Sequence, residues 1–437
     1  MAASASPDRP FGIALAGLLS LAVAMGIGRF AFTPLLPIML AERSVTLAGA
    51  SLLASANYLG YLVGALVCTC QPWLWRRLGW APAVNGPRLV RAGLVATALL
   101  TLGMALHAPG AWPLLRFAAG VASAVVFLYT SGWCLEQLAR RGVPAMGALI
   151  YVGPGAGIVA SGLAATGLVQ FEAAAAIGWL TFGVLAGLLT AAVWSVFDAR
   201  RGLPAPAVGP GGGSHALPPA QAGAIEMAWL TVGYGLAGIG YIVTATFLPV
   251  IARQALPGSP WLDLFWPLFG AGVMLGAVGA SRLRAGGDLR LRLAGCYAIQ
   301  AVGVAASLVS PTLAGFALGS FLLGLPFTAI TFFAMQEARR VRAAQATSFM
   351  GLLTAMYGVG QIAGPPLAAW LVARSANAAA GFGLALWIAS GLLAVGAVLY
   401  AVMAKAYPLR VVPAEAGTQG VVPRSGSGSA GFPPPRE

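Results

Sequence analysis

Charged residues are scarce in this sequence, and acidic residues are the scarcest of them. Asp, Glu, Lys and Arg make up 8% of the 437 residues, and only 11 residues are acidic. Soluble domains carry about 25% charged residues, which cover their water-facing surface. The shortage therefore argues against a soluble enzyme and against a disordered chain. Only four cysteines are present, none in a CxxC pair, so the framework of an extracellular disulfide-stabilised domain is missing too.

Sequence motifs of the common enzyme and nucleotide-binding classes are also missing. There is no P-loop, HExxH or GxSxG motif, and no cluster has the spacing of metal ligands. We therefore expect no enzymatic activity, no metal ion, no cofactor and no ATP-driven pumping. The net charge of +14 does not indicate nucleic-acid binding, because the arginines stand in short clusters between apolar runs.

Long apolar segments dominate the rest of the sequence. Hydrophobic residues make up 59% of the chain, and the mean hydropathy is +0.84. Most of the segments exceed the roughly 18 residues that indicate a membrane-spanning helix. We predict an all-α polytopic membrane protein with twelve transmembrane helices. The predicted spans are 11–40, 47–71, 90–107, 112–136, 145–169, 173–196, 226–252, 262–281, 293–309, 312–336, 346–373 and 379–403.

The basic residues predict the orientation of these spans. With the N-terminus in the cytoplasm, 20 of the 25 Lys and Arg residues fall on the cytoplasmic side. Three fall outside, namely Arg43, Arg253 and Arg374, and two lie within spans. This asymmetry is the positive-inside rule, so we expect both termini to be cytoplasmic.

The connections between spans predict two halves. The longest one, 197–225, is rich in Pro and Gly and has no hydrophobic period, which is typical of a flexible linker. It would separate an N-terminal six-helix half, 11–196, from a C-terminal six-helix half, 226–403. We expect residues 1–10 to be a cytoplasmic N-terminus and 404–437 a disordered cytoplasmic tail.

Short sequence repeats relate the two halves. Residues 26–37 read GIGRFAFTPLLP and residues 238–249 read GIGYIVTATFLP, an offset of 212. Gly157 of the fifth span is matched in the same order by Gly360 of the eleventh. These matches predict duplication of a six-helix unit into two pseudo-symmetric halves. Parallel repeats of this kind place a binding site near mid-membrane, between the halves.

Two arginines lie within spans, where charge is costly. Arg29 stands about 16 Å from the outer end of its helix, near mid-membrane, whereas Arg116 is about one turn inside its span. No Asp or Glu lies deep in any span. A buried arginine without an acid suits an anionic substrate. The alternative is structural: Arg29 would bind backbone carbonyls of a neighbouring helix, and Arg116 would reach the membrane surface or pair locally.

Polar and aromatic side chains gather in the spans that would face this site. Asn57 and Tyr61 of the second span stand four residues apart and therefore share a helix face, as do Tyr357 and Gln361 of the eleventh span. Tyr241 of the seventh span occupies the repeat position of Arg29. Each could instead join helices by a hydrogen bond, worth about 0.6 kcal/mol on average. The predicted substrate-binding residues are Arg29, Asn57, Tyr61, Arg116, Tyr241, Tyr357 and Gln361.

Glycine and proline stand together in the fifth and eleventh spans, as GPGAG at 153–157 and AGPP at 363–366. Proline removes a helix hydrogen bond and glycine lets helices approach closely. We therefore predict a hinge or a tight packing seam. Its residues are Gly153, Pro154, Gly157, Gly364 and Pro365.

As a set, these motifs resemble the major facilitator superfamily. RFAAG at 116–120 resembles the RxxxG pattern of the fourth span, and GPGAG resembles the GPxxG motif of antiporters. GIGRFAFTPLLP, ANYLGYLVGAL, GIGYIVTATFLP and YGVGQIAGP are similar to the YbfB/YjiJ-type branch of bacterial transporters. The resemblance implies the major facilitator fold, alternating access and a bacterial inner (plasma) membrane. One departure is Cys68, near which the superfamily has an acidic residue, so the cytoplasmic gate is expected to differ.

Together these features predict a secondary active transporter that moves a small molecule, favoured to be a small organic anion. The GPGAG motif favours efflux. Two alternatives stay open: an uptake permease of the same fold, and a transporter-like membrane sensor that binds its ligand without moving it. The expected partners are the small-molecule substrate and the lipid bilayer, with no nucleic acid, and the protein is expected to be a monomer.

Overall fold

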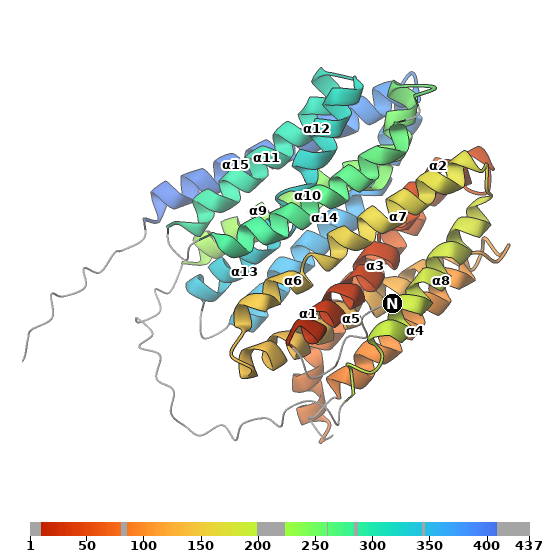
Figure 1. The fold of residues 1–437 in the computed structure, drawn as a ribbon. Helices are drawn as coiled ribbons and strands as arrows, with labels where there is room; N and C mark the ends of the chain where they lie inside the picture. Colours follow the sequence, from red (N-terminus) through yellow and green to blue (C-terminus); the bar gives the residue numbers. More distant parts are fainter. Residues whose placement is uncertain are drawn as a thin grey trace, which may run out of the picture.

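The computed structural model describes residues 10–79, 85–198, 223–259, 261–283, 287–342 and 346–408. Within these residues the secondary structure is entirely helical (Figure 1). The first nine residues and most of the predicted linker and tail lie outside the described residues, so those assignments stay predictions. The elements are α1 (Pro10–Leu21), η1 (Ala22–Ile27), α2 (Phe32–Ala41), α3 (Leu47–Arg77), α4 (Gly86–Gly103), α5 (Trp112–Arg140), η2 (Pro144–Met146), α6 (Gly147–Ile150), α7 (Gly153–Gln170), α8 (Ala175–Val193), α9 (Ala224–Ala255), η3 (Leu262–Leu264), α10 (Phe265–Arg282), α11 (Leu289–Val309), α12 (Leu313–Gly324), α13 (Phe327–Val341), α14 (Ala346–Arg374) and α15 (Ala378–Ala406).

Ten helical segments of the described residues are long and apolar enough to cross a membrane. The two other predicted spans are also helical, as α4 and α14. Their sequences are less apolar, because α4 carries Arg88 and Arg91 and α14 carries Gln361 and two prolines. A multi-pass helical membrane protein is thus confirmed, while the count of twelve spans remains a prediction.

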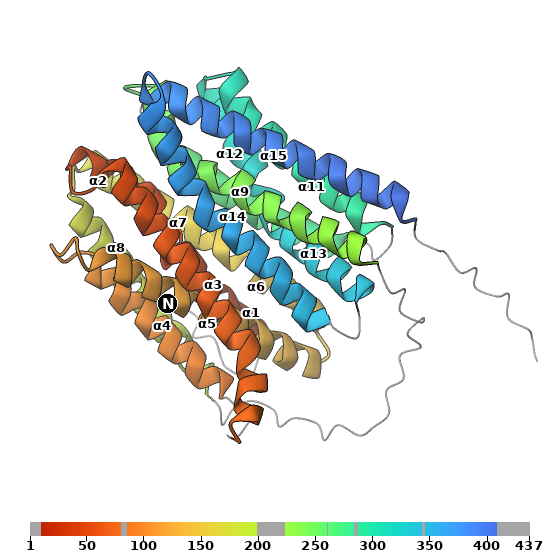
Figure 2. The same cartoon turned by 180° about the vertical axis from the view of Figure 1, so that it is seen from behind.

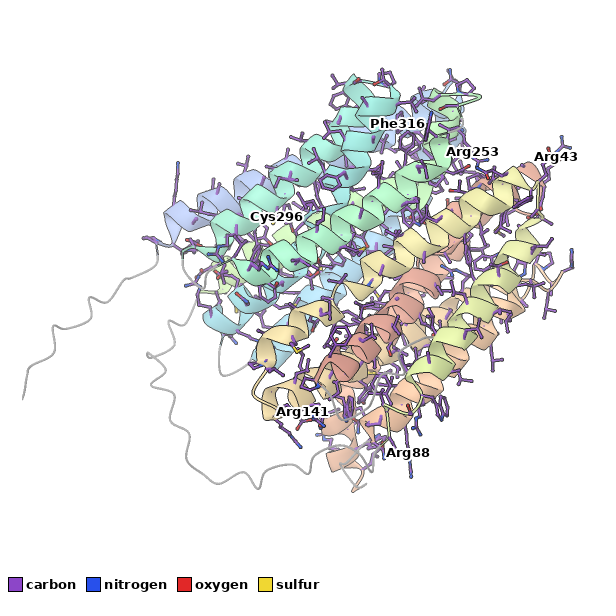
Figure 3. All side chains as sticks on the ribbon, viewed as in Figure 1. Arg43, Arg88, Arg141, Arg253, Cys296 and Phe316 are labelled. Atoms are coloured by element: carbon purple, nitrogen blue, oxygen red, sulfur yellow. The ribbon has the colours of Figure 1, made fainter. Side chains whose placement is uncertain are left out.

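The helices form two groups that lie side by side along their length. Figures 1 and 2 show α1–α8, in red to yellow-green, on one side and α9–α15, in green to blue, on the other. Figure 3 shows Arg43 and Arg253 at one end of the helices and Arg88 and Arg141 at the opposite end. The arginines predicted to lie outside and those predicted to lie in the cytoplasm are therefore at opposite ends of the helices.

Equivalent glycines make equivalent close contacts in the two groups. A Cβ added to Gly26 of η1 would lie 2.3 Å from the Cα of Gly157 on α7. A Cβ on Gly360 of α14, which packs beside Gly238 of α9, would lie 2.7 Å from the carbonyl oxygen of Gly235. Both separations are too short for a side chain, so the backbones of these helix pairs meet at glycine in each group. The contacts agree with the repeat that the sequence predicts.

A second equivalence lies at the end of the molecule where α4 and α11 begin. Nε and Nη2 of Arg91 donate to the backbone carbonyl of Trp194, just past α8, at 3.0 and 2.7 Å. Nη2 of Arg290 donates to the backbone carbonyl of Tyr407, just past α15, at 2.6 Å. Each arginine caps the C-terminus of the last helix of its group, where the helix dipole favours a positive charge.

Arg290 also holds together a cluster of acidic side chains. It is fully buried and lies 2.8 Å from Asp288, 3.3 Å from Glu226 and 3.7 Å from Glu337. Burial alone would raise the pKa of Asp288, but hydrogen bonds from the Arg290 side chain and backbone outweigh it and hold that pKa below its ordinary value. This cluster fixes the starts of α9 and α11 against the end of α13.

Candidate functional site

The first membrane-spanning segment is interrupted at the depth of Arg29. α1 passes into the π-helical turn η1, where Gly28 N donates to Val23 O at 2.8 Å. The α-helix resumes only at Phe32 with α2. Thr33 N donates to the carbonyl oxygen of Phe30 at 3.2 Å, so it does not donate to that of Arg29, four residues before it. The carbonyl groups at the break must therefore find donors on other spans.

Arg116 and Asn57 supply those donors. Nη1 and Nη2 of Arg116 donate to the carbonyl oxygens of Gly28 and Arg29 at 3.2 and 3.0 Å. The Asn57 side-chain amide donates to the carbonyl oxygen of Gly28 at 3.4 Å and to that of Arg116 at 2.9 Å. Both side chains are buried, with Arg116 2% exposed. The structure thus places these two predicted ligands against backbone, where their hydrogen bonds hold the segment that carries Arg29.

The guanidinium of Arg29 lies at the junction of the two helix groups. Its Nη2 donates to Gln361 Oε1 on α14 at 2.6 Å, and Gln361 Nε2 in turn donates to the Tyr241 hydroxyl on α9. The guanidinium carbon lies 4.3 Å from the ring centre of Tyr61 and 5.2 Å from that of Tyr58, both on α3. These contacts are cation–π interactions, strongest where water is excluded. Arg29 and its repeat equivalent Tyr241 therefore meet through one amide.

Among the residues that the structure describes, no acid neutralises this arginine. Arg29 is 4% exposed, and none of the ion pairs among the described residues includes it. Its Nε is buried without a hydrogen-bond partner. Arg29 carries a positive charge deep in a membrane span, and its side-chain hydrogen-bond partner is a neutral amide. Its charge and its remaining N–H donors are therefore available to an anion.

A stack of tyrosines extends from the site along α9 and α14. The ring of Tyr357 lies 5.7 Å from that of Tyr241 and 4.8 Å from that of Tyr234, centre to centre. The Tyr234 hydroxyl donates to Thr331 on α13 at 3.1 Å. Tyr234 stands seven residues before Tyr241, two helical turns away on the same face. That spacing was the signal in the sequence that could have identified it.

On the other side of Arg29, three hydrogen bonds join the two groups. Thr33 Oγ1 donates to the carbonyl oxygen of Ala245 at 3.0 Å, across the repeat offset of 212. The hydroxyls of Tyr58 and Thr246 are 3.1 Å apart. Ser55 donates to the carbonyl oxygen of Ile362 at 2.8 Å. These bonds lie toward the ends of α2 and α9 that the sequence predicts to face outward.

Five of the seven predicted binding residues therefore adjoin one another, and two lie behind them. Tyr58, the neighbour of Asn57, also contacts Arg29 but is not among the predicted ligands. The five that adjoin one another are Arg29, Tyr61, Tyr241, Tyr357 and Gln361. Within the described residues, no three His, Cys, Asp or Glu side chains gather closely enough to hold a metal ion.

The glycine and proline motifs of the fifth and eleventh spans differ in the structure. The fifth span is interrupted after α6 and restarts at Gly153, with Pro154 in the first turn of α7. A Cβ on Gly153 would lie 2.2 Å from the carbonyl oxygen of Leu18. α14 runs unbroken through Pro365, and a Cβ on Gly364 would lie 2.3 Å from a methyl carbon of Ile242. The fifth span is therefore broken and the eleventh tightly packed.

Sequence comparison decides the family. A family described as uncharacterised MFS-type transporter YbfB matches residues 21–401, which include both helix groups and the site. The chain belongs to this family. The YbfB-type resemblance of the motifs is thereby confirmed, and the family is one of membrane transporters rather than enzymes. No curated protein matches the chain.

Solved structures of other transporters share this fold. The nucleoside transporter NupG has a TM-score of 0.63 and 14% identity, covering 91% of this YbfB-type chain and 99% of its own. A mutant of NupG has a TM-score of 0.64 and 15% identity over 90% and 99% of the two chains. The human organic anion transporter MFSD10 (TETRAN) has a TM-score of 0.57 and 14% identity over 90% and 99%. At these identities the likeness establishes the fold alone.

Proposed function

We propose that this protein is a secondary active transporter that moves a small organic anion across the bacterial inner membrane by alternating access. Arg29 binds the negative charge, and Tyr61, Tyr241, Tyr357 and Gln361 form the surrounding neutral contacts. Export is the favoured direction, on the strength of the GPGAG motif. The protein acts as a monomer with both termini in the cytoplasm.

One observation carries the proposal: Arg29 is buried at mid-span and is bound by an amide instead of a carboxylate. Removing a guanidinium from water costs several kcal/mol, and a neutral partner offsets only part of it. A carboxylate on the substrate would add both charge neutralisation and a second hydrogen bond to the planar fork. The site is therefore complementary to an anion.

Gln361 acts in this proposal as the partner of Arg29 when no substrate is bound. Its carbonyl oxygen accepts a hydrogen bond from Arg29 Nη2 at 2.6 Å, and its amide nitrogen donates to the hydroxyl of Tyr241. An incoming carboxylate replaces that carbonyl oxygen, because a charged acceptor binds a guanidinium more strongly than a neutral one. Arg29 belongs to the first helix group and Gln361 to the second. Substrate binding thus replaces the direct hydrogen bond between Arg29 and Gln361 by contacts of both helix groups with the substrate.

Transport then requires the two groups to move apart on alternate sides of the site. The hydrogen bonds Thr33–Ala245 and Tyr58–Thr246 close the predicted outer side in this structure. Opening that side breaks them and lets the anion leave. Arg116 and Asn57 keep the interrupted first span rigid during the movement, since they donate to its carbonyl oxygens at Gly28 and Arg29.

Counterflow in proteoliposomes tests transport directly. Vesicles containing the full-length protein are loaded with an unlabelled carboxylate and diluted into the same carboxylate in labelled form, across a panel of mono- and dicarboxylates. We expect transient accumulation of label inside the vesicles for at least one of them. Empty vesicles are the control. Binding to the protein without any exchange of label would identify a sensor and contradict the proposal.

A further inference from the structure

A groove between α4 and α8 lies on the face of the first helix group away from α9–α15. It has a volume of about 550 Å³, within the range of ligand sites. Val95, Leu99 and Leu102 of α4 form one wall, and Gly183, Gly187 and Trp194 lie on the other. Leu99 is 61% exposed, as a side chain facing lipid would be.

Glycine makes room for this groove on α8. A Cβ added to Gly187 would meet no atom within 4 Å, so the space beside it is open. The groove therefore offers an apolar channel along two helices in which a flexible hydrocarbon chain fits better than a rigid polar molecule. Because the surface faces the bilayer, the available hydrocarbon chains are those of membrane lipids.

The groove has a charged end. Arg91 and Arg88 stand four and seven residues before Val95, so they continue the face of α4 that lines the groove. The guanidinium carbon of Arg91 lies 4.8 Å from the ring centre of Trp194, which closes the groove at that end. Arg88 is exposed. Tryptophan and arginine together mark the level of lipid headgroups.

We propose that this groove binds one anionic glycerophospholipid. An acyl chain lies between α4 and α8, and the phosphate is held by Arg88 and Arg91 beside Trp194. The charge of the two arginines selects a lipid with net negative charge over a zwitterionic one, since no acidic side chain lines the groove. The bound lipid joins α4 to α8, and this inference is independent of what Arg29 binds.

Native mass spectrometry of the delipidated full-length protein tests the proposal. The protein is titrated with dioleoyl phosphatidylglycerol and, separately, dioleoyl phosphatidylcholine, so the acyl chains are identical. For the wild type we expect phosphatidylglycerol to bind about fivefold or more tightly, as expected for basic residues near a headgroup. Arg88→Gln should remove most of that preference. Gly187→Phe should fill the groove and weaken phosphatidylglycerol binding roughly tenfold, the loss expected when an acyl chain cannot enter.

Gly391→Phe is the matched control, because Gly391 of α15 also has open space where a Cβ would lie. It should bind phosphatidylglycerol like the wild type. Equal affinity of the wild type for the two lipids, or undiminished phosphatidylglycerol binding by a folded Gly187→Phe variant, would overturn the proposal. If Gly187→Phe fails to fold, Arg88→Gln still tests the headgroup site. An unchanged preference of that variant for phosphatidylglycerol would contradict the proposal.

Discussion

Replacing Arg29 by alanine is expected to abolish transport of the substrate while leaving membrane insertion near normal. The guanidinium is the charge that the proposed anion meets, and truncating one partner of a buried charge pair costs about 2–5 kcal/mol. Substrate affinity should therefore fall by roughly thirtyfold to several thousandfold. Arg29→Lys keeps the positive charge but loses the planar guanidinium, so its substrate affinity should lie between those of the wild type and Arg29→Ala. Counterflow at matched protein density measures both variants.

Arg253→Ala is the control for loss of an arginine. Arg253 pairs with Asp263 at 2.6 Å at the end of α9 and is partly exposed, so its removal should change transport little. Size-exclusion profiles of all variants establish that they are folded. Wild-type counterflow by Arg29→Ala would show that Arg29 is structural, and the anion assignment would fall with it.

Gln361→Glu is expected to make substrate binding depend on pH. The new carboxylate has nearly the shape of the amide and would form an ion pair with Arg29, thereby occupying the site of the substrate charge. At neutral pH we expect anion affinity to drop about tenfold or more, the effect of losing about 1.4 kcal/mol or more of charge attraction. As the pH falls through the pKa of the new carboxyl group, that group is neutralised and affinity should return.

The sign of this effect separates it from simple damage to the site. Gln361→Met, which is similar in size and uncharged, should show no gain in affinity on acidification. The wild type has no carboxylate beside Arg29, so its anion affinity should likewise not increase on acidification. The measurement is the affinity for a strongly acidic organic anion, such as a sulfonate, which stays ionised while the pH falls through the pKa of the new carboxyl group. Unchanged affinity of Gln361→Glu at neutral pH would show that Gln361 does not stand where the substrate charge binds.

The fold could be predicted closely because its determinants are local in the sequence. Apolar length predicts spans, and the arginine distribution matches the two ends at which Arg43 and Arg88 lie. The repeat at an offset of 212 anticipates the bond between Thr33 and Ala245. The weaker hydropathy of α4 and α14 arises from residues that serve other roles, such as Arg91, which caps the end of α8.

The site was harder to predict because depth alone does not tell which way a side chain points. Arg29 and Arg116 look alike in the sequence as isolated arginines in apolar spans. The break between η1 and α2 decides between them, since it frees two carbonyls that Arg116 binds. The π-helical turn contains Gly26, which packs against Gly157 of another span, and the sequence of a single span does not reveal such a contact. Arg116 neither reaches the membrane surface nor pairs locally, but binds backbone carbonyls of another span, which was the alternative considered for Arg29. Arg29 instead faces Gln361.

The central claim is that Arg29 forms a site for an anion, and paired ligands test it most directly. The measurement is the thermal midpoint of the purified protein with a panel of carboxylates, each beside its uncharged amide of the same shape. A ligand at a hundred times its Kd stabilises the folded state by about 2.7 kcal/mol, which is readily detected. We predict that at least one carboxylate raises the midpoint of the wild type, that its amide does not, and that Arg29→Ala abolishes the response. Equal stabilisation by amide and carboxylate, or an undiminished response of Arg29→Ala, would contradict the account.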